Sequence, residues 1–112
     1  MKTYCLALDL HDDPKLIAEY RRYHEPGTIW PEVVDNILGQ GILRERIFLV
    51  GNRMVMVLDV TDDFSFEAKA AGDQGNKKMR EWEELMWKYQ KALSQARPGE
   101  KWIQMEQIFE TP

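Results

Sequence analysis

A segment in the first third of the chain combines a histidine with aromatic side chains that suit a small-molecule site. His24 is one of two histidines in the sequence, and an imidazole, with an ordinary pKa of about 6.5, suits proton transfer near neutral pH. Tyr20 precedes it by four residues, which places both side chains on one face of a helix. Trp30 follows the helix-stopping pair Pro26 and Gly27. These residues are candidates for acid-base chemistry beside an aromatic wall; the alternative is that the aromatic residues only pack and His24 only caps helix carbonyls.

The composition limits the possible functions before any element is considered. The chain has 112 residues and a formal net charge of -4. We therefore expect a single domain over residues 1–112 and no nucleic-acid partner, because phosphate contacts need clustered lysine and arginine. Cys5 is the single cysteine, which excludes an internal disulfide and a cysteine-based zinc site and favours a reducing, cytoplasmic location. No segment approaches the roughly 20 apolar residues of a membrane span, so no membrane partner is expected.

The first half of the chain shows clear strand and helix patterns. A strand is predicted where apolar residues alternate, and helices are predicted where a proline opens a stripe of apolar residues. Gly51 and Asn52 separate two apolar runs and are a strong hairpin signal. The predicted elements are a strand over Lys2–Leu10, a helix from Pro14 to near His24 capped by Asp12 or Asp13, a helix from Pro31 to about Leu38 stopped by Gly39–Gly41, and strands over Ile42–Val50 and Arg53–Val60.

The second half predicts two more helices and a strand. Apolar residues at alternating spacings of three and four, from Met79 to Leu93, indicate one long helix that lies on the sheet. The predicted elements are a short helix over Phe64–Ala71 capped by Thr61–Asp63, a flexible turn over Gly72–Asn76, the long helix ended by Arg97–Gly99, and a strand over Trp102–Phe109.

This order of elements predicts an α+β fold of the ferredoxin-like, split βαβ type, with an antiparallel sheet and helices on one face. The second face of the sheet then needs a cover. The strand Arg53–Val60 is apolar on both sides, which favours a second copy packed sheet against sheet. We therefore expect a homodimer, that is, a dimeric α+β barrel; the alternative is a sheet face wetted by long side chains such as Arg44 and Arg46.

The chain resembles the L-rhamnose mutarotase family, small dimeric ferredoxin-like proteins that interconvert the α and β anomers of a 6-deoxy-L-sugar. The resemblance is carried by Glu19–His24 followed by Ile29–Glu32, which contains the sequence Trp-Pro-Glu. Weaker similarity extends to Lys2–Leu10, to Met79–Trp82 and to Met105–Phe109. It therefore covers nearly the whole chain and implies a carbohydrate isomerase.

The resemblance also implies roles for individual residues. His24 corresponds to the acid-base residue, Tyr20 to a sugar contact, and a tryptophan of the long helix to the pocket wall. The rhamnose-type pattern has two adjacent tryptophans, whereas here four residues separate Trp82 from Trp87, so either can line the pocket. The connection before Trp30 is also longer than usual. These departures leave L-rhamnose and L-fucose both open as the sugar.

Mutarotation requires proton transfer at two oxygens and neither a metal nor a cofactor. No cofactor or metal is expected, because the sequence has no Gly-rich phosphate loop and no His-Glu-x-x-His motif, and His11 is interpreted as a surface residue at a strand end. A neutral sugar can pack its C–H face on Tyr20, Trp30 or Trp82. The second proton carrier stays open.

Functions of another class also fit a dimeric ferredoxin-like protein. Such folds house haem-binding or cofactor-free monooxygenases and non-catalytic modules that bind small ligands. The fold alone does not discriminate between these functions and a sugar isomerase, so the chemistry of the site has to decide.

Overall fold

An antiparallel sheet forms one layer of the computed structural model, which describes residues 1–112. The strands are β1 (Lys2–Leu10), β2 (Ile42–Val50), β3 (Arg53–Val60), β4 (Gln90–Lys91) and β5 (Ile103–Gln104). They are ordered β2-β3-β1-β4, and β5 also pairs with β1. The long hairpin of β2 and β3 forms at Gly51 and Asn52, where Gly51 has a φ of 59° that favours glycine. The predicted strands β1, β2 and β3 are confirmed at their expected bounds.

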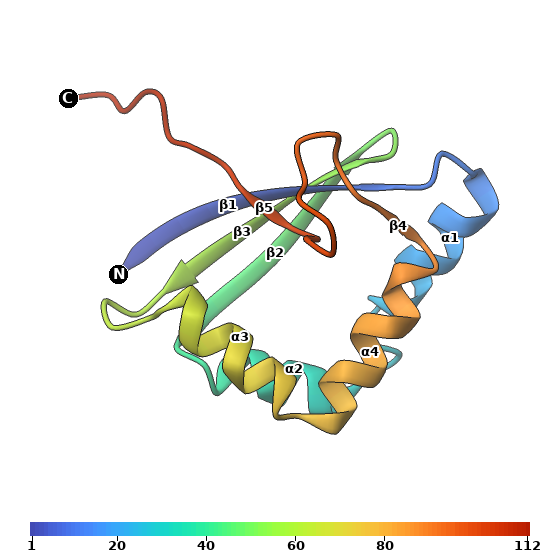
Figure 1. Cartoon of the computed structure of the whole chain (residues 1–112), viewed down its shortest axis with the longest axis horizontal. Helices are drawn as coiled ribbons and strands as arrows, with labels where there is room; N and C mark the ends of the chain where they lie inside the picture. The colour runs from blue at the N-terminus through green and yellow to red at the C-terminus, as the bar shows by residue number, and fades with distance from the viewer.

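The helices α1 (Pro14–Tyr23), α2 (Pro31–Leu38), α3 (Phe66–Gln74) and α4 (Lys77–Trp87) form the second layer. All of them curve below the same face of the sheet (Figure 1). Asp13 caps α1 by accepting hydrogen bonds from the backbone N–H groups of Lys15 and Leu16 at 2.9 and 3.2 Å. The predicted α+β, ferredoxin-like arrangement with helices on one face is confirmed.

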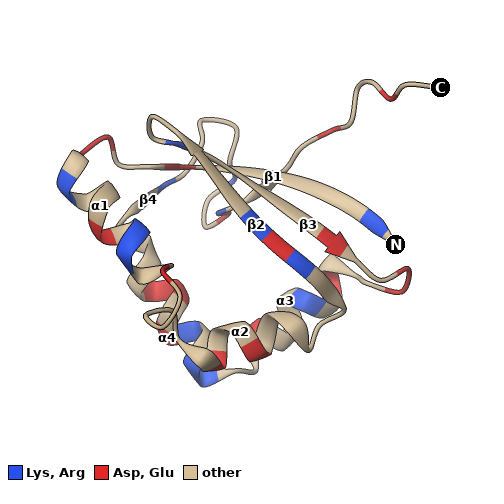
Figure 2. Cartoon of the chain, turned by 180° about the vertical axis from the view of Figure 1, so that it is seen from behind, with Lys and Arg blue, Asp and Glu red and all other residues tan.

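The pairing register decides which strand side chains face the helices. Glu45 pairs with Leu58 and Ile47 pairs with Met56, so these side chains share the helix-facing side. The intervening Arg46 and Phe48 face the open side with their own partners on β3. β2 therefore presents one carboxylate to the layer between sheet and helices. Figure 2 shows this strand with an acidic band between two basic bands.

Two hydrophobic clusters connect the layers. The larger is centred on Leu8, Leu10 and Met54 of the sheet and includes Tyr20, Met79, Trp82 and Met86 of the helices. The smaller contains Leu6, Ile42, Met56, Leu58 and Val60. The alternating pattern of β3 places Met54, Met56 and Leu58 in these clusters, whereas Val55 and Val57 on the other side stay half-buried.

Three boundaries in the second half differ from the predictions. Ser65, not Thr61–Asp63, caps α3, and that helix runs into the predicted flexible turn and ends at Gln74, which leaves only Gly75 and Asn76 between the two helices. The predicted long helix ends at Trp87, because the chain turns there so that Gln90–Lys91 pair with β1. Helical spacing beyond Trp87 was therefore misleading, since sheet pairing overrides local periodicity.

The predicted last strand over Trp102–Phe109 is wrong for most of its length. Only Ile103 and Gln104 form β5, the backbone N–H of Met105 still donates to the Cys5 carbonyl of β1 at 2.7 Å, and the chain beyond it leads away from the sheet to the C-terminus (Figure 1). Ile108 and Phe109 in this tail are 90% and 67% exposed. No helix in the structure has the length and apolar character that crossing a membrane requires.

Candidate functional site

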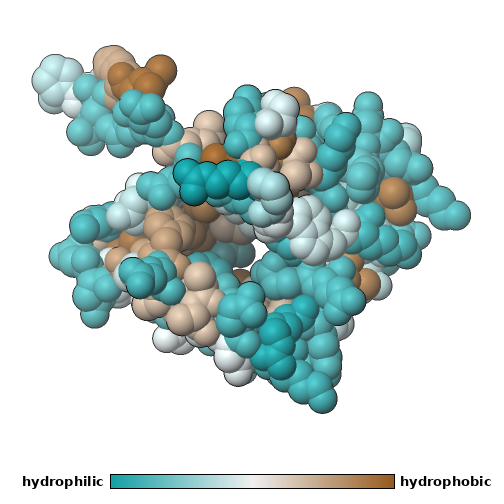
Figure 3. Space-filling model, viewed as in Figure 1, coloured by the Kyte–Doolittle hydropathy of each residue, from teal (hydrophilic) through white to brown (hydrophobic).

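A cavity of about 480 Å³ lies between the sheet and the helices. The space-filling view shows it as a hollow with hydrophobic walls (Figure 3). Its size suits a small molecule, since ligand pockets span about 300 to 1,000 Å³. Its lining includes Tyr20, His24, Glu45, Trp82, Trp87 and Gln90. A second, more open hollow shares Tyr20, His24 and Glu45 with it.

His24 stands at the C-terminal cap of α1, where the chain leaves the helix toward Pro26 and Gly27. Its Nδ1 lies 2.7 Å from the backbone carbonyl oxygen of Tyr20. Because a carbonyl can only accept, Nδ1 carries the proton, and the neutral ring has a bare Nε2. Burial lowers the pKa of His24, and the bond to the carbonyl only partly opposes this effect. Near neutral pH the imidazole is thus a proton acceptor.

Tyr20 is buried beside His24, with the two ring centroids 4.3 Å apart. Its hydroxyl accepts a hydrogen bond of 3.2 Å from Nε2 of Gln90, which leaves the hydroxyl proton free to be donated. Burial raises the pKa of Tyr20 to about 12, so the phenol stays protonated. Gln90 is only 5% exposed, and its Oε1 has no hydrogen-bond partner. An unpaired buried acceptor at the cavity wall suits a ligand hydroxyl.

Three tryptophans contribute to this region in different ways. Trp82 is 5% exposed and meets the ring of His24 edge to face at 5.4 Å. Trp30 packs against Trp82 at 5.2 Å and does not line the cavity, so it supports the wall from behind. Trp87 lines the cavity, is 37% exposed, and lies under the ammonium of Lys101 at 4.7 Å. Trp82 thus belongs to both the core and the cavity wall.

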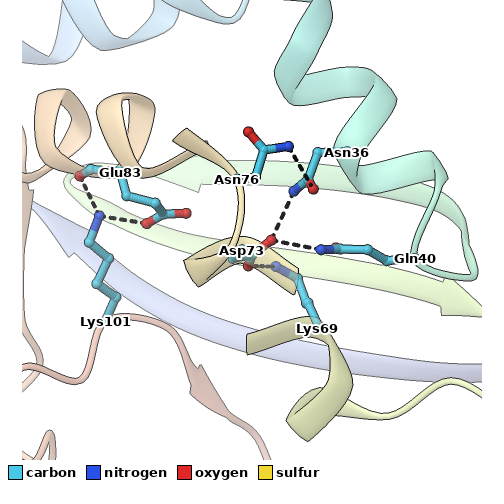
Figure 4. A network of polar contacts seen from close by, with 7 residues as sticks. All are labelled: Asn36, Gln40, Lys69, Asp73, Asn76, Glu83 and Lys101. Carbon is cyan, nitrogen blue, oxygen red and sulfur yellow. Dashed lines mark hydrogen bonds and ion pairs between the residues drawn. The ribbon is translucent and has the colours of Figure 1, made fainter. Parts of the chain in front are cut away.

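Charged groups also line the cavity, and Figure 4 shows how they pair with one another and with nearby amides. Asp73 of α3 accepts hydrogen bonds from Asn36 and Gln40 and forms a 2.7 Å ion pair with Lys69. Glu83 of α4 is bound by Lys101 at 2.7 Å. These carboxylates are satisfied within the chain. No group of three or more His, Cys, Asp or Glu side chains is placed to hold a metal ion.

The structure brings four of the five predicted site residues, His24, Tyr20, Trp82 and Trp87, to one cavity. Sequence reasoning missed Gln90, because the predicted long helix hid the strand that points it at Tyr20. It also missed Glu45, although a lone acidic residue at an inward position of an alternating strand is a signal that could have found it.

An antiparallel sheet with helices on one face, and a cavity that holds a histidine among aromatic rings, defines a ferredoxin-like protein with a site for a small molecule. Residues 3–111 match the family model described as L-rhamnose mutarotase. The chain belongs to the L-rhamnose mutarotase family, whose members are isomerases.

Individual relatives support this assignment. An L-fucose mutarotase from Xanthomonas campestris is 48% identical over 109 residues, which is 97% of this chain and 87% of that protein. A UPF0734 protein of Dictyostelium discoideum is 33% identical over 97% of this chain and 89% of its own length. Among solved structures, an L-rhamnose mutarotase from Formosa agariphila has a TM-score of 0.67 at 17% identity, with both chains fully covered. Tetracenomycin F2 cyclase from Streptomyces glaucescens shares the fold at a TM-score of 0.62 and 13% identity, again over both whole chains.

Proposed function

We propose that this protein is a mutarotase that interconverts the α and β anomers of a 6-deoxy-L-hexose. The observation that carries the proposal is the hydrogen bond between Nδ1 of His24 and the Tyr20 carbonyl, which leaves Nε2 as a base beside an aromatic cavity. Opening a cyclic hemiacetal requires a base for the proton of the anomeric hydroxyl. His24 is therefore the catalytic residue of this proposal.

The remaining lining groups suit a neutral sugar. Trp82 and Trp87 offer aromatic surface to the C–H groups of the ring, with Trp30 holding Trp82 in place. Tyr20 offers a hydroxyl proton, and Gln90 offers an unpaired acceptor. The sugar can thus stack on one wall while its hydroxyls pair with polar atoms on another.

L-fucose is the first sugar to test, because the relative with 48% identity is named an L-fucose mutarotase. L-rhamnose is the second, because the family model bears its name. Both are 6-deoxy sugars, and a methyl group at C5 suits the many apolar residues of the cavity.

Saturation-transfer NMR tests the proposal directly. Saturation of one anomeric proton is carried to the other anomer at the rate of exchange, so L-fucose, L-rhamnose and D-glucose are compared with and without protein. We expect faster exchange for at least one 6-deoxy-L-sugar than for D-glucose. Binding of the sugar with exchange at its spontaneous rate identifies a non-catalytic module instead, and a Soret band after incubation with haem identifies a haem protein.

The proposal includes a homodimer formed through the open face of the sheet. Val55 and Val57 lie half-buried on this face, and Phe48 beside them is 54% exposed. Apolar residues on the uncovered face of a sheet favour a partner surface. A second copy placed about a two-fold axis offers the same residues in return.

A further inference from the structure

Glu45 is the one carboxylate that β2 presents to the helix-facing side of the sheet. Its pairing with Leu58 places it over the core, next to Ile47 on the same strand face. It lines both hollows that contain His24 and Tyr20. Glu45 therefore lies on the sheet side of the cavity, whereas His24 lies on the helical side, at the end of α1.

The carboxyl group of Glu45 has no hydrogen bond or ion pair within the chain, unlike those of Asp73 and Glu83. Lys69 is the cation that lowers the pKa of Glu45, but it is already bound to Asp73 at 2.7 Å. Lys101 is likewise bound to Glu83 at 2.7 Å. The charged and titratable groups that line the same hollows as Glu45 are Tyr20, Arg21, His24 and Glu25 in α1 and just after it, Lys69 and Asp73 of α3, Glu83 of α4, and Lys101. A half-buried carboxyl without a partner costs stability, so its presence calls for a ligand or a reaction.

We propose that Glu45 is the second proton carrier of the mutarotase, exchanging a proton with the ring oxygen while His24 exchanges one with the anomeric hydroxyl. The inference rests on the proposed function and assigns the role that His24 alone leaves unfilled.

The proton balance closes over one cycle. In ring opening, Nε2 of His24 takes the proton from O1, the O1 electron pair forms the C1=O1 bond, the C1–O5 bond breaks, and the Glu45 carboxylic acid gives its proton to O5. The open-chain aldehyde then rotates about C1–C2. In closure, Glu45 carboxylate takes the proton from O5 as O5 attacks the other carbonyl face, and His24 returns its proton to O1. Both residues end in their starting state.

The environments of the two groups favour these starting states. Burial lowers the pKa of His24 and raises the pKa of Glu45, the latter opposed by Lys69 and assisted by Glu83 and Asp73. These shifts widen the pH range in which the imidazole is neutral and extend upward the pH range in which the carboxyl is protonated, so the two ranges move toward each other. Two titratable groups whose environments move their pKa values in opposite directions are the pattern of an acid and a base that work together.

The test compares Glu45→Gln with the wild-type protein by saturation-transfer NMR across pH. Gln keeps the shape of the acid and can still form hydrogen bonds but carries no acidic proton to transfer, so we expect exchange to fall by a factor of about 10² to 10⁴. The wild-type rate should be bell-shaped with pH. In the wild type, the rate should rise with pH as His24 loses its proton and decline at higher pH as Glu45 loses its proton. The variant should keep the rise and lose the decline.

Glu84→Gln is the matched control, because Glu84 is an exposed acid of α4 that lines neither hollow. It should leave rate and pH profile unchanged. Retention of more than about a third of wild-type exchange by folded Glu45→Gln, or an unchanged bell, overturns the inference. Loss of sugar affinity with an unchanged bell assigns Glu45 to binding alone and also overturns it. If the wild-type protein itself does not accelerate exchange, the proposed function fails instead, so the two failures are distinguishable.

Discussion

At the scale of single residues, position in the helix decides the chemistry of His24. The side chain of a C-cap residue lies close to the last carbonyls of its helix, and here Nδ1 takes the carbonyl of Tyr20. That contact fixes the tautomer, while burial keeps the ring neutral. This one contact therefore serves both the capping role and the proposed catalytic role, so the two roles are compatible.

Replacing His24 tests this assignment. His24→Gln should lower enzyme-driven anomer exchange by a factor of about 10² to 10⁴, because Gln cannot shuttle a proton near neutral pH. Sugar affinity should change far less. His11→Gln, which alters the other, exposed histidine, should leave the rate unchanged. Retention of more than about a third of the exchange by folded His24→Gln would leave Tyr20 or a water molecule as the carrier.

The two tryptophans of α4 should respond differently to truncation. Trp82→Ala removes a 5% exposed core residue and should cost about 3 to 5 kcal/mol in the free energy of unfolding. Trp87→Ala removes a 37% exposed residue, so its stability loss should be smaller, while sugar binding should weaken by about 1 kcal/mol, or roughly fivefold. Urea unfolding and sugar titration measure both effects. Unchanged affinity in Trp87→Ala would remove it from the sugar wall.

The burial of Glu45 should also make the free energy of unfolding depend on pH. Its pKa is raised in the folded state, so its contribution to stability is present below the ordinary pKa of about 4.3 and is lost as pH rises through the folded value. Glu45→Gln should therefore be more stable than the wild type at pH 7, and the difference should shrink toward pH 4. Thermal unfolding at both pH values measures it. Equal stability at pH 7 would show that the carboxylate is well solvated.

At the scale of elements, the junctions decide how the layers close around the cavity. Gly41 joins α2 to β2 with a φ of 81°, and its carbonyl accepts a hydrogen bond from Thr61 N–H at the end of β3. A Cβ at this position would lie 2.7 Å from Oγ1 of Thr61. The start of β2, and with it the placement of Glu45, thus depends on a residue without a side chain.

Gly41→Ala should be more damaging than Gly51→Ala. Both glycines have positive φ, at 81° and 59°, so each substitution pays a backbone cost of about 1 to 2 kcal/mol. A Cβ at Gly51 meets nothing within 4 Å, whereas at Gly41 it clashes with Thr61 and adds about 1 to 3 kcal/mol. Chemical denaturation of both variants gives the difference. Equal losses would show that Thr61 moves aside freely.

At the scale of the whole molecule, the helices cover one sheet face and the other carries half-buried valines beside Phe48. The proposed two-fold dimer places one copy of this face against the other. The protein should therefore have the mass of a dimer in light scattering at micromolar concentration.

Val55→Glu tests the dimer, because it puts one new charge on the open sheet face of each copy. Its mass should fall toward that of a monomer with helix content preserved, since a buried unpaired charge is costly at an interface. Leu38→Glu is the control, because Leu38 is 57% exposed on α2, on the helical layer. A wild-type monomer, or a Val55→Glu dimer, would contradict sheet-to-sheet association.

The sequence by itself determined the strands β1 to β3, the helices α1 and α2, and the histidine beside its tyrosine. These features are set by local signals: alternation, proline at helix starts, glycine in the hairpin, and the spacing of Tyr20 and His24. Only the tertiary structure decided that the chain leaves its helix after Trp87 and that most of the C-terminal segment stays unpaired. Gln90 reaches Tyr20 across a sequence separation of 70, and Glu45 enters the cavity because its pairing with Leu58 turns it inward. Such contacts depend on pairing between distant segments, which no local pattern encodes.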